Sequence, residues 1–179
     1  MITVISGTDR HNSNTLKVAE LCCRLLQANK EECELLDLTK LPANIFNAKN
    51  YGNKSPEMER YQTMILKTDG ILVVTPEYNG SFPGALKYFI DLLKFPESLY
   101  RKPCAFVGVS SGSFGGLRPV EHLEMVFNYR EANLFGQRVF IARVTEKLSP
   151  DGKDITDAFV KDLLVKMISG FSQFVNKLK

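Results

Sequence analysis

The sequence lacks long hydrophobic runs, and this absence bears on where the protein works. No segment approaches the roughly 18–20 consecutive apolar residues that a membrane-spanning helix needs. The first residues, MITVISG, are apolar at once and show neither the basic region nor the small-residue cleavage site of a secretory signal. We therefore expect a cytoplasmic protein without a membrane partner.

Blocks of like charge and metal-binding cysteine spacings are also missing. The 23 basic and 20 acidic residues are interspersed, with a formal net charge of +3, so nucleic acid is not an expected partner. The four cysteines show no CxxC or Cys/His ligand spacing, which argues against a structural zinc or iron–sulfur site. We expect buried, reduced thiols and no metal. A chain of this length, 44% hydrophobic, can bury one substantial core, so residues 1–179 are predicted to form a single domain.

Short β-branched runs alternate with longer amphipathic stretches, which is typical of βα units wound into a parallel sheet. The predicted strands are residues 2–6, 33–38, 70–75, 104–110 and 138–144. The predicted helices are residues 15–29, 55–68, 83–95, 117–133 and 156–179. Five parallel strands with right-handed crossovers favour the order 2-1-3-4-5, which is a flavodoxin-like three-layer α/β/α sandwich. Residues 38–54 form one long irregular stretch, and loops of this length are usually functional or mobile.

The loop after the first predicted strand is rich in groups that bind anions. In such a sheet, ligands bind beyond the carboxyl ends of the strands, near the point where the strand order reverses. Hydroxyls, an amide, the Arg10 guanidinium and the N–H groups of a helix start together suit a phosphate monoester. The loop contains neither GxGxxG nor GxxxxGK(S/T), which excludes a Rossmann turn and a Walker loop. A simple helix cap by Ser13, Asn14 and Thr15 stays open as the alternative.

The loop after the third predicted strand reads TPEYNGSFPGALKYFID, and its chemistry suits a flat heteroaromatic ring. Two prolines, Pro76 and Pro83, stiffen the backbone. Two glycines, Gly80 and Gly84, permit a close approach or a positive φ, and Tyr78 offers a planar wall. An ordinary Pro/Gly turn before a helix is the alternative interpretation.

Both loops, with a third one, resemble those of a known family. The string PEYNGSFPGALKYFID resembles the PEYN-x-x-x-PG-x-LK signature of the NADPH-dependent FMN reductase family, which includes quinone, azo-dye and chromate reductases. The first loop is similar to the family's GSxRxxSxN phosphate loop, with Gly7, Thr8, Arg10 and Ser13 in register. The stretch SSGSFGGLR after the fourth strand looks like its glycine-rich third flavin loop. The resemblance covers most of the chain.

This resemblance implies an enzyme that binds FMN and passes reducing equivalents from NADPH or NADH to a small acceptor. The acceptor classes it implies are quinones, free flavins, azo compounds and metal oxyanions, reduced by a ping-pong mechanism. The flavin itself carries the redox chemistry, so no catalytic side chain is expected. The residues implied for the FMN phosphate are Thr8, Arg10, Ser13, Asn14 and Thr15. Those implied for the ring and ribityl chain are Pro76, Glu77, Tyr78, Asn79, Gly80, Ser81, Ser111 and Gly112. The resemblance also implies a homodimer or homotetramer.

Other functions remain to be weighed on the same fold. A flavodoxin-like electron carrier, or a flavin-binding module without NAD(P)H turnover, is the main alternative; a carrier would have a strongly acidic face, whereas this chain is basic. A phosphate-binding hydrolase would need a Cys-x₅-Arg loop after the first strand, which is absent. Arg118 is a candidate contact for the 2′-phosphate of NADPH, although a surface salt bridge is the favoured interpretation.

Overall fold

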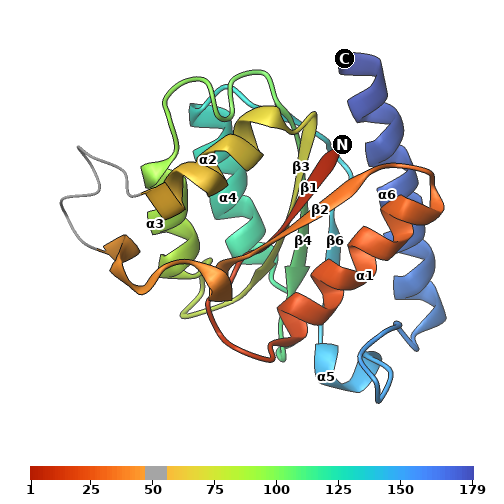
Figure 1. Ribbon diagram of the computed structural model, residues 1–179. Coiled ribbons are helices and arrows are strands. Elements are labelled where there is room, and N and C mark those ends of the chain that lie inside the picture. Colours follow the sequence, from red (N-terminus) through yellow and green to blue (C-terminus); the bar gives the residue numbers. More distant parts are fainter. Residues whose placement is uncertain (47–55) are drawn as a thin grey trace.

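A parallel sheet lies between two layers of helices in the computed structural model, which describes residues 1–46 and 56–179 (Figure 1). The strands are β1 (Ile2–Ser6), β2 (Cys33–Asp37), β3 (Gly70–Pro76), β4 (Pro103–Val109), β5 (Asn133–Leu134) and β6 (Val139–Ile141). The helices are α1 (Asn14–Ala28), α2 (Pro56–Lys67), α3 (Gly84–Leu92), α4 (Leu117–Tyr129), α5 (Val144–Lys147) and α6 (Ala158–Leu178), with 3₁₀ turns η1 (Leu38–Lys40) and η2 (Ala43–Phe46). The order β2-β1-β3-β4-β5 confirms the predicted flavodoxin-like topology.

The fifth position of the sheet differs from the prediction of one strand over residues 138–144. Two short strands share it: β5 pairs with the start of β4, and β6 pairs with its end. The chain leaves the sheet between them, where the ring of Phe135 packs against the aromatic rings of α6. Left-handed backbone at Arg143 ends β6 early, and the same conformation at Glu131 ends α4 before the predicted residue 133. The other predicted boundaries are exact or move by no more than three residues.

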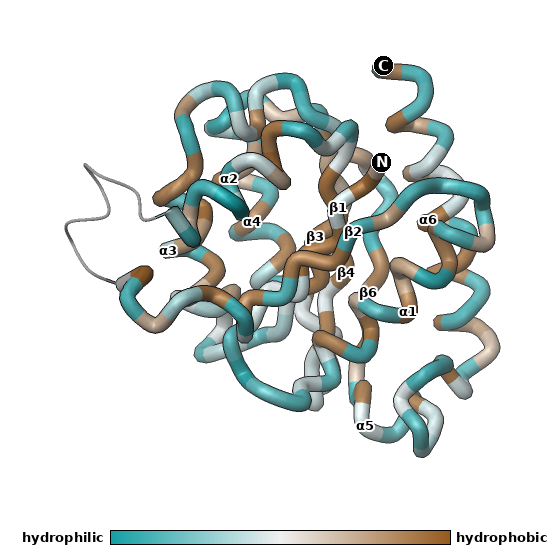
Figure 2. The backbone as a smooth tube through the Cα atoms, viewed as in Figure 1, coloured by the Kyte–Doolittle hydropathy of each residue, from teal (hydrophilic) through white to brown (hydrophobic). Residues whose placement is uncertain are grey.

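Each face of the sheet carries its own hydrophobic core. Every residue of β1, β3 and β4 is buried, as the near-continuous apolar runs predict for a sheet covered on both sides. Val4 points to the core beneath α1 and α6, whereas its neighbour Ile5 points to the core beneath α2, α3 and α4. Figure 1 shows α1 and α6 on one side of the strands and α2, α3 and α4 on the other, and Figure 2 shows the hydrophobic strands enclosed between them. The carboxyl ends of the strands therefore meet at one uncovered edge.

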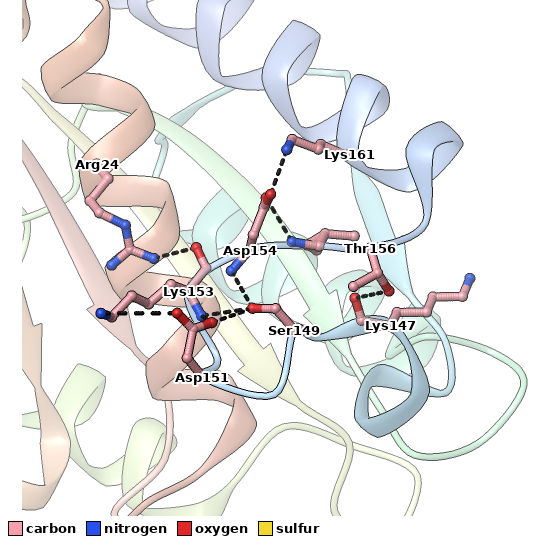
Figure 3. Close-up of polar contacts among 9 residues, drawn as sticks. Arg24, Lys147, Ser149, Asp151, Lys153, Asp154, Thr156 and Lys161 are labelled. Atoms are coloured by element: carbon pink, nitrogen blue, oxygen red, sulfur yellow. Dashed lines mark hydrogen bonds and ion pairs between the residues drawn. The ribbon is translucent and has the colours of Figure 1, made fainter.

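The segment between α5 and α6 is fixed by polar contacts at that edge (Figure 3). The Ser149 hydroxyl oxygen accepts the N–H groups of Lys153 (3.1 Å) and Asp154 (2.9 Å). Arg24 of α1 donates to the Lys153 carbonyl at 2.7 Å, and Lys161 of α6 pairs with the Asp154 carboxylate. These contacts join the segment to both helices of one layer. They hold α5 beside the carboxyl ends of β4 and β6.

Two predictions concern segments away from this edge. The predicted irregular stretch 38–54 begins with η1 and η2, and its residues 47–54 lie outside the described part of the chain. Among the helices of residues 1–46 and 56–179, none combines the length and apolar character needed to cross a bilayer.

Candidate functional site

The loops after β1, β3 and β4, together with the start of α5, surround a hollow of about 850 Å³. This is within the range of small-molecule sites, about 300–1,000 Å³. The predicted residues that line it are Arg10, Ser13, Asn14, Thr15, Pro76, Glu77, Tyr78, Ser111 and Gly112. The predicted residues outside the lining are Thr8, Asn79, Gly80 and Ser81. Topology therefore brings the three loops to one place, as expected for a doubly wound sheet.

Thr8 lies beneath the hollow and connects two of its loops. Its side chain is fully buried, and its Oγ1 atom is 2.8 Å from the Tyr78 hydroxyl oxygen. The same Oγ1 accepts the Arg10 N–H at 3.2 Å. The residue thus holds the Arg10 backbone and the Tyr78 ring in fixed relation to each other.

The anion-binding end of the hollow lies at the start of α1. Ser13 caps this helix, because its Oγ accepts the Leu16 N–H at 3.1 Å, so the capping alternative is observed for that hydroxyl. Thr15 is only 2% exposed, and it lines the hollow. The exposed Arg10 guanidinium has no ion pair within the described part of the chain. The first N–H groups of any α-helix also lack intrahelical acceptors. This end therefore offers spare donors to an anion.

A tight turn explains why three predicted ring residues lie outside the lining. Tyr78 and Ser81 exchange backbone hydrogen bonds of 2.8 and 3.0 Å around Asn79 and Gly80. Both central residues have positive φ values, 51° and 76°, as an Asn-Gly turn of type I′ requires. The Ser81 hydroxyl lies 2.8 Å from Nδ1 of His122 on α4. Asn79, Gly80 and Ser81 therefore shape and anchor the loop that presents Tyr78.

A salt bridge stands at the edge of the hollow. Arg118 Nη1 lies 2.9 Å from Glu77 Oε1, and the guanidinium lies 4.9 Å from the centre of the Phe114 ring. The favoured interpretation of Arg118 as a salt-bridge residue is thus observed, although the residue also lines the hollow. The bridge balances the Glu77 charge close to the site.

Glycines of the third loop serve mainly to fold it onto the sheet. A Cβ on Gly108 of β4 would lie 2.6 Å from the Gly115 carbonyl oxygen and 2.7 Å from that of Gly116. Gly115 and Gly116 themselves have positive φ values of 62° and 82°. Only Gly112 of these four lines the hollow. Sequence reasoning missed Gly108, although a glycine inside a predicted strand signals a close backbone approach.

Several lining residues were not predicted. The start of α5 contributes Val144 and Thr145, and Asn14 donates to the Thr145 hydroxyl at 3.3 Å. The Val144 N–H donates to the Ser110 carbonyl at 3.0 Å, which joins α5 to the loop after β4. The remaining unpredicted lining residues are His11, Asn12, Val109, Ser110, Ser113 and Phe114.

A second hollow, of about 450 Å³, lies between α3 and α4. Phe95, Met125 and Tyr129 line it and are 62, 63 and 78% exposed. Phe82 and Tyr88 are partly buried and pack against the core beneath α2, α3 and α4.

The first hollow thus combines a cationic, donor-rich end with a flat wall, which suits a ligand that has a phosphate and a planar ring. No cluster of three or more His, Cys, Asp or Glu side chains suited to a metal ion occurs in the parts of the chain that are described. The fit to FMN is therefore one of hydrogen bonding and shape.

Comparisons with known proteins agree with this chemistry. A family model described as NADPH-dependent FMN reductase matches residues 1–146. A quinone reductase of Escherichia coli is 27% identical over 181 residues, covering 99% of this chain and 96% of that protein. An NADPH azoreductase of a Bacillus species is 27% identical over 169 residues, covering 93% and 92%. The structure of FerB, a flavoenzyme NAD(P)H:(acceptor) oxidoreductase from Paracoccus denitrificans, is similar with a TM-score of 0.81 and 25% identity, covering 98% of this chain and 97% of that one.

Proposed function

Because the chain belongs to the NADPH-dependent FMN reductase family, and is thus an FMN-dependent NAD(P)H oxidoreductase, we propose that its FMN occupies the hollow at the carboxyl edge of the sheet. One observation carries this placement. The anion donors at the start of α1 and the flat wall after β3 lie in the same hollow, although about sixty residues separate them in sequence.

The phosphate part of the proposal rests on the donors beside the start of α1. Arg10 supplies a full positive charge, and Thr15, which also lines the hollow, supplies a hydroxyl donor. Helix N-termini favour anions through their free N–H groups and the helix dipole. A phosphate bound here satisfies all three kinds of donor. Ser13 contributes by fixing the helix start, and Asn14 contributes by joining it to Thr145.

The ring end holds the flavin by shape and by backbone contact. Pro76 and Tyr78 line the hollow from the loop after β3, and Ser111 and Gly112 line it from the loop after the neighbouring strand. The Glu77–Arg118 bridge balances the charge of a carboxylate that lines the hollow. When bound, FMN supplies the redox chemistry by accepting and releasing reducing equivalents. The protein then needs only to bind and orient its ligands and to limit the access of water.

We infer the acceptor class from the relatives. A quinone reductase and an NADPH azoreductase both align along more than nine-tenths of this chain, which supports a quinone or an azo compound as acceptor. The family description supports NADPH as donor. We further infer that donor and acceptor react in turn, in a ping-pong order.

Two half-reactions test this function directly. The protein loaded with FMN and kept without oxygen should lose its flavin absorbance on adding NADPH or NADH alone. A small quinone, added after the nicotinamide is removed, should then restore the absorbance without any further protein. If the flavin absorbance does not fall, the proposed reductase activity is contradicted. If it falls only when a separate reductase is added, the electron-carrier function is favoured. A second half-reaction that needs NADPH still present would contradict the ping-pong order.

We also propose a cytoplasmic, homo-oligomeric protein in which residues 1–179 form one domain. The exposed Phe95, Met125 and Tyr129 support a self-association surface, since large clustered apolar side chains mark interaction sites. Lys87 and Asp91, which pair with each other at 2.7 Å, line the same hollow.

Light scattering during size-exclusion chromatography tests the association. The wild-type protein should elute as a dimer or tetramer, and a Tyr129→Glu variant should shift towards the monomer. Val165→Glu, which replaces an exposed apolar residue of α6, is the matched control and should leave the mass unchanged. A monomeric wild-type protein would contradict the proposal.

A further inference from the structure

Two of the four cysteines lie together at a place remote from the proposed flavin site. Cys23 is on α1 and Cys33 is the first residue of β2, two elements that pack side by side (Figure 1). Their Sγ atoms are 2.6 Å apart, whereas the bond in a disulfide is about 2.05 Å long. A movement of about half an ångström would therefore bring them to bonding distance.

We propose that Cys23 and Cys33 form a reversible disulfide when the protein meets a hydroperoxide. The reaction removes two electrons and two protons from the thiols. The Cys33 thiolate attacks one peroxide oxygen, the O–O bond breaks, and an alcohol or water leaves. The Cys23 sulfur then attacks Cys33 Sγ and displaces the oxygen as water, which forms the S–S bond. A dithiol returns both cysteines to thiols by exchange.

Cys33 has the properties of the attacking thiol. It is half-buried, whereas Cys23 is only 9% exposed. The hydrogen bond between the two side chains lowers the pKa of Cys33, and the same contact, together with burial, raises the pKa of Cys23. The thiolate is the reactive form of cysteine, so Cys33, the less buried of the two, also has the larger thiolate fraction.

The other two cysteines do not compete for this reaction. Cys22 and Cys104 are fully buried, and burial raises the pKa of each thiol. Cys104 also lies in the core on the opposite face of the sheet. Exposure and distance therefore single out Cys23 and Cys33 as the two cysteines that form the disulfide.

Its position separates this inference from the proposed flavin chemistry. Cys23 lies nine residues after Asn14 on α1, which is about 14 Å along the helix axis. Disulfide formation there does not fill or cover the hollow. We expect FMN affinity to change less than twofold on oxidation, so neither proposal depends on the other.

Mass spectrometry after treatment with hydrogen peroxide tests the pair. The intact protein should lose about 2 Da and two titratable thiols, and dithiothreitol should restore both. Trypsin places Cys23 in residues 18–24 and Cys33 in residues 31–40, so a disulfide-linked peptide pair is expected. Fragmentation of the first peptide between Cys22 and Cys23 then assigns the linked sulfur.

Variants supply the matched control. Cys33→Ser should abolish the 2 Da loss, whereas Cys104→Ala should retain it. Linkage through Cys22 or Cys104, linkage only between two chains, or oxygen addition without linkage would overturn the proposal. The peptide map of the wild-type protein decides the question even if a variant fails to fold.

Discussion

An Arg10→Ala variant should bind FMN about 10- to 100-fold more weakly, while its affinity for riboflavin changes less than about twofold. Arg10 lines the hollow beside the start of α1 and has no ion pair among the described residues. Charge-assisted hydrogen bonds to a phosphate contribute about 1.5–3 kcal/mol, and about 1.4 kcal/mol corresponds to a tenfold change in affinity. Riboflavin has the same ring without the phosphate. Quenching of flavin fluorescence during titration measures both constants.

The matched control removes the same charge elsewhere. Arg60 is exposed on α2, on the far side of the sheet from α1, and Arg60→Ala should leave both affinities unchanged. Equal losses of affinity for FMN and riboflavin in Arg10→Ala would contradict the assignment of Arg10 to the phosphate. Arg10→Lys should recover part of the affinity for FMN, because a lysine keeps the charge but loses the paired geometry of the guanidinium.

Local sequence was sufficient to predict the parts of the site that come from continuous loops. The residues from Arg10 to Thr15 follow directly on β1, so their arrangement at a helix start was readable from the strand and the helix pattern. The contribution of α5 was not readable. Asn14 and Thr145 meet although 131 residues separate them, and no local pattern encodes that distance.

The same contrast between local sequence signals and long-range contacts explains which parts of the fold could be predicted. Strands β1, β3 and β4 are buried on both faces, so their near-continuous apolar runs marked them as strands. The alternation of strands and helices then predicted their order. The early ends of α4 and β6 depend on left-handed backbone at Glu131 and Arg143. Neither residue type favours that conformation, so the sequence carried no signal for it.

We expect the largest effect on stability from a glycine that shapes the third loop rather than from one that lines the hollow. A Gly108→Ala variant should lower the free energy of unfolding by about 3 kcal/mol or more. The new methyl group would meet two backbone carbonyl oxygens, at 2.6 and 2.7 Å, and backbone yields less easily than a side chain. Urea unfolding followed by circular dichroism measures the change.

Gly84→Ala supplies the control for this prediction. Nothing lies within 4 Å of a Cβ at Gly84, the exposed first residue of α3, so the variant should keep or gain up to about 1 kcal/mol of stability. Equal stabilities of the two variants would show that the loop after β4 yields freely to the methyl group. If instead Gly108→Ala folds with the expected loss, its FMN affinity should also fall, because Ser111 and Gly112 belong to the same displaced loop. A destabilised variant with unchanged FMN affinity would separate the loop's packing from its place in the proposed flavin site.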